Sequence, residues 1–405
     1  MVAIHPASEL PRSPGHGWPV VAALSLAQVI SWGTIFYGFP LFVVPMEAEL
    51  GWGRSELNGA VSLGLLVSGL AAYPVGRLID ARGGRWLMTI GSALAGIMFL
   101  LWARVGSLPV FYALWFGLGI AQATTLYAPV FAVLTRMFPD DFRLRITILT
   151  LAGGFASTVF IPLIAWWIEA LGWRDALLVV AACNLLLCLP VHGLLLRDHG
   201  RRDADAAPLP AAEDPMRRAL RHPVFWGLAV CFTFYFLMHT MLAFHFIPMF
   251  AEYGLPLGVA VGILAVIGPA QVAGRVLLLF GRRLDAVANG IIVMALFMVS
   301  LPLLILFPTI VPVLFVFAAL YGAANGMMTI LRGTAVPDLL WREGYGAING
   351  ALTLPTALAA AVAPSLAAWI WGLGGGYFPV LVCALVFAMI AATAFGYAVL
   401  RRRRG

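Results

Sequence analysis

Three ionisable side chains inside long apolar runs of the sequence, where a charge is costly, are the first candidates for function. Arg275 lies in the run 256–281, with Gln271 one helical turn earlier on the same face, and that run contains no acidic residue. His239 and His245 lie in another run, 223–251, and are the side chains in it whose charge changes near neutral pH. Six residues apart on a helix, they point to different faces, so we expect at most one of them to line a cavity. Ionisable groups in such helices generally face a polar cavity and serve binding or proton transfer.

Five uncharged polar side chains in other apolar runs are further candidates for a binding site: Tyr37, Gln122, Tyr127, Asn325 and Asn349. Each can form hydrogen bonds with a solute. Each can equally join two helices through a hydrogen bond, and for any single residue this packing role is the simpler explanation.

The sequence contains no recognisable catalytic, metal-binding or nucleotide-binding arrangement. No Ser/His/Asp, His-rich or carboxylate cluster occurs, and Cys183, Cys188, Cys231 and Cys383 lie in apolar runs without metal-ligand spacing. No P-loop occurs, which excludes direct coupling to ATP within this chain. We therefore expect no enzyme activity, no metal and no cofactor.

The elements that must position these residues are membrane-spanning helices. Of the 405 residues 62% are hydrophobic and only 11% are charged, too few polar groups to cover a soluble protein of this size. A helix needs roughly 20 apolar residues to cross the hydrocarbon layer, where backbone polar groups must pair internally. The apolar runs predict twelve spans, at 18–46, 57–79, 87–105, 107–136, 143–170, 174–196, 223–251, 256–281, 286–306, 308–336, 343–372 and 376–400.

The spans divide into two sets of six. The one long hydrophilic stretch, 197–222, predicts a linker between an N-terminal bundle, 18–196, and a C-terminal bundle, 223–400. Short tails are expected at 1–17 and 401–405.

The distribution of basic residues predicts the orientation of the chain. If the N-terminus is cytoplasmic, only Arg54, Arg104 and Arg174 of the 25 basic residues face outward. The positive-inside rule then places the linker and both tails in the cytoplasm. The net charge of +7 is dispersed over short loops, which argues against a nucleic-acid-binding surface.

Short segments of the first set recur 198 positions later in the second. Gly64-Leu65-Leu66, Gly76-Arg77-Leu78 and Gly83-Gly84-Arg85 correspond to Gly262-Ile263-Leu264, Gly274-Arg275-Val276 and Gly281-Arg282-Arg283. Repeats half a chain apart are expected of transporters whose two bundles rock about a central site.

The loop after the second span resembles a known signature. Its sequence, Gly76-Arg77-Leu78-Ile79-Asp80-Ala81-Arg82-Gly83-Gly84-Arg85, is similar to the G-x-L-x-D-R-x-G-R-R motif of the major facilitator superfamily, although Ala81 stands where a basic residue is usual. Residues 37–45, residues 51–55, and His245 with Pro248 and Gly254 resemble the monocarboxylate and oxalate/formate branch of that superfamily. The resemblance implies an all-α integral membrane fold of 12 transmembrane helices in two pseudo-symmetric six-helix bundles.

The resemblance implies that Gly76, Asp80 and Arg85 belong to a gate. An aspartate at a cytoplasmic helix end can face the N-terminus of a neighbouring helix and pair with a basic residue, which holds the gate shut until substrate binds. We expect Arg136, at the end of the fourth span, to be the partner of Asp80. The alternative is that these charges only fix the membrane topology.

The resemblance also implies that Arg275 binds a substrate carboxylate, to which a guanidinium is well matched. The alternative is that Arg275 repeats Arg77 and extends to the cytoplasmic interface. His245 matches the family pattern before its proline and is the preferred proton-coupling candidate, with His239 second. In the oxalate type a second cation is expected in span eleven, where the only basic residue is Arg342 at the start, so a monocarboxylate is favoured over a dianion.

These features predict a secondary active transporter of a small organic anion, a monocarboxylate, working by alternating access, with proton coupling as a hypothesis. Its partners are expected to be this small-molecule substrate, protons and the lipid bilayer of a bacterial inner membrane, with no nucleic acid, and the chain is expected to act as a monomer. An exporter of an apolar or drug-like compound is the alternative on the same fold, although the fifth span lacks the Gly-Pro-rich motif typical of drug antiporters. A membrane sensor or channel without coupled transport is the alternative of another class.

Overall fold

The computed structural model describes residues 17–196, 214–280 and 285–402 of the chain, and its regular elements there are all helical. The first six spans comprise α1 (Trp18–Ser31), the π-helical turn Trp32–Tyr37, α2 (Phe39–Leu50), α3 (Arg54–Arg82), α4 (Arg85–Trp102), α5 (Leu108–Thr125), α6 (Tyr127–Met137), α7 (Phe142–Gly153), α8 (Ala156–Leu171), α9 (Trp173–Ala182) and the π-helical turns Cys183–Cys188 and Val191–Leu195. The second six spans are α11 (Pro223–Glu252), α12 (Leu257–Phe280), α13 (Ala286–Leu306), α14 (Val311–Leu339), α15 (Tyr345–Gly374) and α16 (Phe378–Arg401).

Twelve of these spans are long and apolar enough to cross a membrane, which confirms the predicted number. Their bounds lie within a few residues of the prediction. The second span, for example, extends from Arg54 to Arg82 instead of 57–79. Within the predicted linker, Pro215–Arg221 form a short helix, α10, whereas 197–213 lie outside the described residues. Most of the two predicted tails, and the repeat segment Gly281-Arg282-Arg283, also lie outside them.

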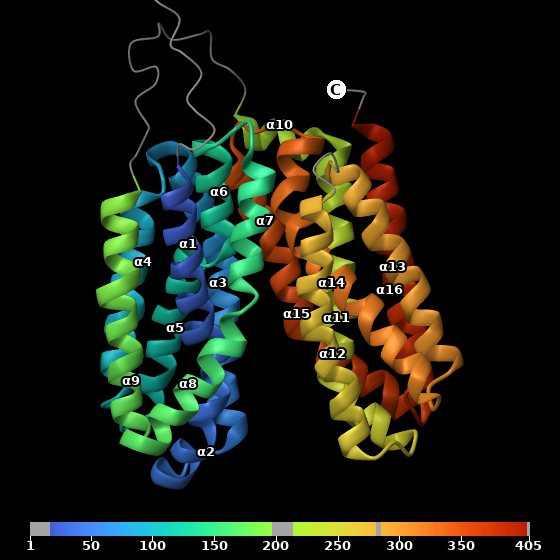
Figure 1. Cartoon of the computed structure of the whole chain (residues 1–405), viewed down its shortest axis with the longest axis horizontal. Coiled ribbons are helices and arrows are strands. Elements are labelled where there is room, and N and C mark those ends of the chain that lie inside the picture. The colour runs from blue at the N-terminus through green and yellow to red at the C-terminus, as the bar shows by residue number, and fades with distance from the viewer. Residues whose placement is uncertain (1–16, 197–213, 281–284, 403–405) are drawn as a thin grey trace, which may run out of the picture.

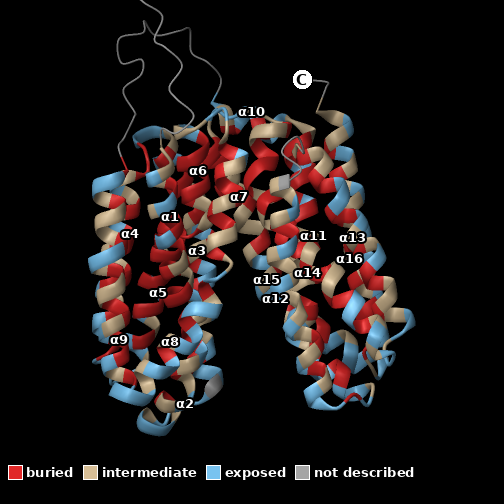
Figure 2. Ribbon diagram, viewed as in Figure 1, coloured by how far each residue is buried: buried red, intermediate tan, exposed pale blue. Residues whose placement is uncertain are grey.

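The two sets of spans form two bundles that lie side by side (Figure 1). The bundles meet at the end of the molecule where α10 and the C-terminal end of α16 lie, which we call the linker end, and they diverge toward the opposite, far end. Buried residues run through the middle of each bundle, and exposed residues lie on its outer faces (Figure 2). Many exposed side chains are large and apolar, among them Leu186, Phe244 and Leu400, as expected where the surrounding solvent is lipid.

At the linker end the bundles touch through α3 and α15, backbone against backbone. A Cβ atom on Gly76 would lie 1.9 Å from the carbonyl oxygen of Gly346, and one on Gly350 would lie 2.3 Å from that of Ala72. Only glycine permits so close an approach, which is why small residues mark helix contacts in membranes. A second contact joins α7 to α14, where the Arg143 guanidinium binds the Asp338 carboxylate in bidentate fashion at 2.6–3.0 Å.

The fourth span is broken between α5 and α6. Pro129 has no N–H to donate to the carbonyl of Thr125 four residues earlier, and the helix ends there with Leu126 in an extended conformation. The buried Gln28 side chain of α1 satisfies that carbonyl, with Nε2 2.6 Å from Thr125 O. The fifth span is broken at Gly154 and Phe155, between α7 and α8, where two adjacent glycines weaken the helix. Both breaks expose backbone toward the middle of the molecule.

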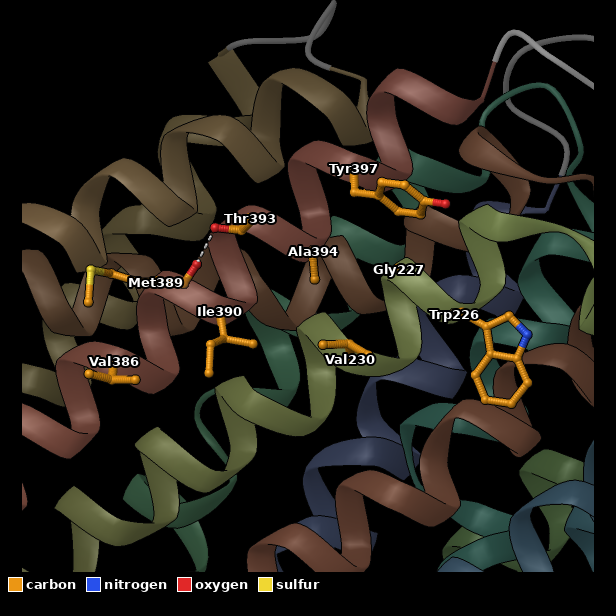
Figure 3. A pocket seen from close by; sticks show the side chains of 9 residues that line it. All are labelled: Trp226, Gly227, Val230, Val386, Met389, Ile390, Thr393, Ala394 and Tyr397. Atoms are coloured by element: carbon orange, nitrogen blue, oxygen red, sulfur yellow. Dashed lines mark hydrogen bonds between the residues drawn. The ribbon is translucent and has the colours of Figure 1, made fainter.

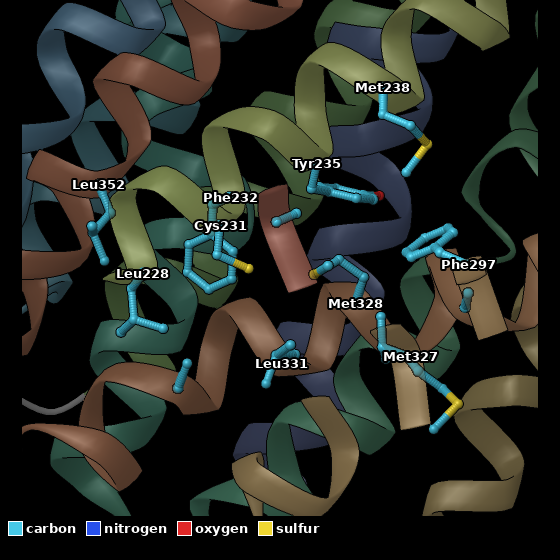
Figure 4. Packing of buried hydrophobic residues seen from close by; sticks show 14 of the residues in the cluster. Leu228, Cys231, Phe232, Tyr235, Met238, Phe297, Met327, Met328, Leu331 and Leu352 are labelled. Atoms are coloured by element: carbon cyan, nitrogen blue, oxygen red, sulfur yellow. The ribbon is translucent and has the colours of Figure 1, made fainter. Parts of the chain in front are cut away.

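The core of the second bundle is rich in methionine and aromatic rings. Met238, Met327 and Met328 pack near Phe297 and Tyr235, from α11, α13 and α14 (Figure 4). Flexible thioethers fill the irregular gaps between such rings. The packing fixes Tyr235 in place beside the central cavity described next.

Candidate functional site

A cavity of about 900 Å³ lies between the two bundles. Its lining comes from both halves of the chain, including the two broken spans. The polar lining side chains are Trp32, Tyr37, Ser68, Gln122, Tyr127, Ser157, Thr158, Tyr235, His239, Gln271, Arg275, Asn325, Thr329, Arg332 and Thr353. Among the residues that the structure describes, no aspartate or glutamate lines the cavity.

Most of the binding-site candidates from the sequence meet in this cavity. Those that line it are Tyr37, Gln122, Tyr127, His239, Gln271, Arg275 and Asn325. They come from spans one, four, seven, eight and ten, so the fold gathers residues that are up to 288 positions apart in the chain.

Arg275 reaches from one bundle to the other. Its side chain is only 5% exposed, and Nη1 donates to the carbonyl oxygen of Thr150 in α7 at 2.8 Å, while Nε lies 3.4 Å from the carbonyl oxygen of Gly326 in α14. The Thr150 carbonyl lies in the last turn before the α7–α8 break, and Gly154 at the break leaves room for the guanidinium. Arg275 therefore does not extend to the membrane interface, as the alternative reading of its repeat with Arg77 required.

Arg332 is a second cation in the same cavity, and the sequence reasoning missed it. It lies in α14, and its guanidinium stands over the ring of Phe236 at 4.6 Å from the ring centre. No described residue gives this guanidinium a hydrogen bond or an ion pair. A signal was available in the sequence: Asn325, Thr329 and Arg332 follow one another at intervals of four and three residues, which places them on one helical face.

His239 belongs to a chain of polar contacts at the cavity wall. Its Nδ1 lies 2.9 Å from the hydroxyl of Tyr321, and its ring stacks on Tyr235 at 5.5 Å. The Tyr235 hydroxyl donates to Asn325 Oδ1 at 2.7 Å, and Asn325 Nδ2 donates to the carbonyl oxygen of Tyr321 at 2.7 Å. The imidazole is therefore held in a fixed orientation by side chains of α11 and α14.

His245 and Asn349 do not line the cavity. The His245 ring lies between the Tyr377 hydroxyl, at 3.0 Å from Nδ1, and the Pro364 carbonyl oxygen, at 3.1 Å from Nε2. Six residues turn a helix by about 240° and advance it by about 9 Å, so His245 faces another side of α11 than His239. Asn349 borders a small closed space beside the α3–α15 contact.

Of the loop residues expected to form a gate, Gly76 and Asp80 lie at that contact. Asp80 accepts hydrogen bonds from the backbone N–H groups of Gly346, at 2.9 Å, and Ala347, at 2.8 Å, in the first turn of α15. Arg136 is next to Asp80, but its Nη1 donates to the carbonyl oxygens of Ile79 and Asp80 rather than to the carboxylate. Arg85 donates to the Gly193 carbonyl at 2.7 Å, within the first bundle.

A second concave surface lies outside the bundles, between α11 and α16 (Figure 3). This groove of about 580 Å³ is lined by Trp226, Gly227, Val230, Val386, Met389, Ile390, Thr393, Ala394 and Tyr397. The Thr393 hydroxyl is already bonded to the Met389 carbonyl at 2.8 Å. Since none of its lining residues carries a charge, the groove does not match the polar candidates, and the central cavity is the candidate site.

A family model described as the Major Facilitator Superfamily matches residues 24–284. The chain belongs to the Major Facilitator Superfamily. Its twelve helices in two bundles are the fold of that superfamily, and the resemblance inferred from the Gly76–Arg85 loop is confirmed. As a member of this superfamily the chain is a multi-pass membrane transporter.

Among the relatives of this chain are a monocarboxylate transporter and an oxalate:formate antiporter. Monocarboxylate transporter 13 of Rattus norvegicus is 27% identical over 337 residues, which cover 82% of this chain and 76% of the relative. The oxalate:formate antiporter of Oxalobacter formigenes is 25% identical over 337 residues, which cover 82% of this chain and 75% of the relative. The solved structure of the E. coli fucose:proton symporter FucP superimposes with a TM-score of 0.72 at 15% identity, covering 96% of this chain and 99% of that one, a likeness of fold.

The charged side chains that line the cavity are both positive. Arg275 and Arg332 bring two cations into a space that contains no acidic side chain among the described residues. Taking a cation out of water costs several kcal/mol unless a partner compensates it. An anionic ligand would provide that compensation, and Tyr37, Gln122 and Gln271 line the same cavity with hydrogen-bond donors.

Proposed function

We propose that this superfamily member is a secondary active carrier of a small organic anion, a carboxylate, and that it works by alternating access. The observation that carries the proposal is the buried Arg275 guanidinium in a cavity without a described acidic residue. Arginine binds carboxylates through two parallel hydrogen bonds, which gives orientation as well as affinity. The names of the relatives, a monocarboxylate transporter and an oxalate:formate antiporter, support a carboxylate cargo.

We infer further that the linker end faces the cytoplasm of a bacterial cell and that the structure is an outward-facing state. The distribution of arginine supports this orientation, because Arg104 and Arg174 lie at the far end whereas most others lie at the linker end. The contacts of Asp80 with α15 and of Arg143 with Asp338 then act as the closed cytoplasmic gate. Labelling of a cysteine at position 104 by a membrane-impermeant reagent in intact cells tests the orientation.

His239 is the proposed proton-coupling residue. His239 lines the cavity and its ring contacts Tyr321 and Tyr235, whereas His245 lies outside the cavity. Imidazole is the side chain that changes charge near neutral pH. Protonation of His239 beside two arginines makes the cavity more positive, so it favours the binding of an anion, which is the sign required for proton symport.

The test is counterflow uptake in proteoliposomes over a panel of carboxylates, with Arg275→Gln as the variant. Loss of one partner from a buried charge pair costs about 2–5 kcal/mol, so we expect transport efficiency to fall by roughly 30-fold or more. Arg104→Gln, in the exposed turn between α4 and α5, is the matched control and is expected to transport normally. Carboxylate transport that survives Arg275→Gln unchanged would refute the site.

A second candidate function has one observation in its favour. Aromatic rings occupy much of the cavity wall, with Trp32 and Tyr127 4.8 Å apart between ring centres and Phe36 and Phe155 nearby in the lining. Such a wall suits an apolar or drug-like compound. Export of hydrophobic dyes that is indifferent to Arg275→Gln, without carboxylate uptake, would favour this function.

A further inference from the structure

Arg332 carries a charge for which the described residues provide no counter-ion. Its guanidinium lies at the cavity, half-buried, and its described contact is the face of the Phe236 ring. A cation over an aromatic ring gains about 0.5–2 kcal/mol, much less than desolvation of a charge costs. The N–H groups of the guanidinium, which point in a planar fork, therefore remain available to a ligand.

The contacts that join the bundles at the linker end do not involve the Arg332 guanidinium. Two acidic residues lie toward the linker end and both have other partners: both carboxylate oxygens of Asp80 accept backbone N–H groups of α15, and the Asp338 carboxylate binds Arg143. Tyr345, which lies near Arg332 and Asp80, donates its hydroxyl hydrogen to the carbonyl oxygen of Gly333. Arg332 forms neither an ion pair nor a hydrogen bond with these groups in the part of the chain that the structure describes.

The two arginines line the same cavity from α12 and α14, which pack against each other. The Arg275 guanidinium touches α14 at Gly326, and Arg332 lies six residues further along that helix, about 9 Å along its axis. The six residues also turn the helix by about 240°, so Gly326 and Arg332 lie on different faces of α14, but the Arg332 side chain lines the same cavity as Arg275. Tyr235 lies within electrostatic reach of both arginines. A ligand with two anionic groups can form an ion pair of about 2.8 Å with each guanidinium, and a short carbon chain between these groups spans the rest of the distance.

We propose that Arg332 binds a second anionic group of the substrate, so that the cargo is a short dicarboxylate held between Arg275 and Arg332. This inference rests on the proposed function of an organic-anion carrier. A monoanion bound at Arg275 leaves the Arg332 charge unpaired, whereas a dicarboxylate compensates both cations in a cavity without a described acidic residue. The sequence argument against a dianion considered only span eleven, and the second cation comes from span ten.

The experiment compares dicarboxylates with monocarboxylates of the same chain length in proteoliposomes of the full-length protein. Malonate is paired with propionate, succinate with butyrate and glutarate with valerate, as competitors of counterflow at pH 7.5, where all carboxyl groups are ionised. We expect at least one dicarboxylate to compete at 10-fold or more lower concentration than its partner. Equal competition within every pair of the wild-type protein would overturn the inference without any variant.

Arg332→Gln is expected to abolish this preference. Dicarboxylate affinity should fall by 10-fold to 100-fold while monocarboxylate affinity stays within about 3-fold, because only the second anionic group loses its partner. Arg332→Lys keeps the charge without the planar fork and should retain part of the preference. Equal weakening of both classes by Arg332→Gln would indicate a structural role and overturn the inference.

The outcomes separate this inference from the proposed function. Uptake of monocarboxylates with no dicarboxylate preference rejects the role of Arg332 and leaves the carrier function intact. Failure of every carboxylate to compete rejects both. If Arg332→Gln does not yield folded protein, as judged by its melting temperature, the wild-type pairs and Arg332→Lys decide the question.

Discussion

Replacing Asp80 by asparagine removes the charge that joins α3 to α15 at the linker end. The carboxylate accepts two backbone N–H groups in the first turn of α15, where the helix dipole adds to the attraction. Hydrogen bonds to a charged group contribute about 1.5–3 kcal/mol each. Asparagine keeps one acceptor oxygen and turns its amide hydrogens toward the other N–H, so we expect a loss of about 2–4 kcal/mol. A loss of about 2.7 kcal/mol lowers the ratio of closed to open gates about 100-fold.

The gate can be followed by electron spin resonance distances between labels on Arg82→Cys and Glu343→Cys, two exposed positions on either side of the contact. Cys183, Cys188, Cys231 and Cys383 are replaced beforehand. Asp80→Asn should shift the distance distribution toward longer distances, whereas Asp140→Asn, in the exposed turn between α6 and α7, should leave it unchanged. An unchanged distribution in Asp80→Asn would mean that the carboxylate does not hold the bundles together.

Two further substitutions test the proton-coupling residue and the broken helix. His239→Gln keeps a hydrogen bond to Tyr321 but cannot titrate, so uptake should lose its response to an imposed pH gradient while counterflow exchange persists. His245→Gln, outside the cavity, is the matched control, and a response that disappears only in this variant would contradict the assignment. Gln28→Ala leaves the Thr125 carbonyl without its side-chain donor, which should destabilise the fold by about 1–3 kcal/mol and lower the melting temperature. Ser62→Ala removes an exposed hydroxyl that bonds within its own helix, and an equal effect of the two substitutions would rule out a special role for Gln28.

The sequence predicts what depends on composition and periodicity along one helix. The twelve spans follow from apolar runs, and the superfamily follows from the loop around Asp80. The face argument for His239 and His245 holds, since one of them lies in the cavity. Which of the two does so depends on how α11 is rotated against α14, and that rotation is set by packing of Tyr235 and Tyr321.

The contacts between the bundles could not be predicted from the sequence. Asp80 binds the backbone N–H groups of Gly346 and Ala347. Every residue except proline has such a group, so apart from the glycine the sequence of α15 does not indicate this contact. Arg136 was expected to pair with the Asp80 carboxylate, yet it binds carbonyl oxygens, because α15 already occupies the carboxylate. Arg332 was overlooked because the sequence argument for a second cation considered span eleven and not span ten.

The internal repeat relates Arg275, which lines the cavity, to Arg77, which does not. Arg77 and Arg275 occupy equivalent positions, but Arg77 is exposed and Arg275 is buried. At the first position Gly76 presses α3 against the backbone of α15, which leaves no space for a side chain between the bundles. At the second, Gly154 at the α7 break leaves space into which the Arg275 guanidinium extends to reach Thr150. The contact of α3 with α15 is therefore made by backbone, whereas the equivalent contact of α12 with α7 is made by the Arg275 guanidinium. An anion that binds Arg275 acts directly on this second contact between the two bundles.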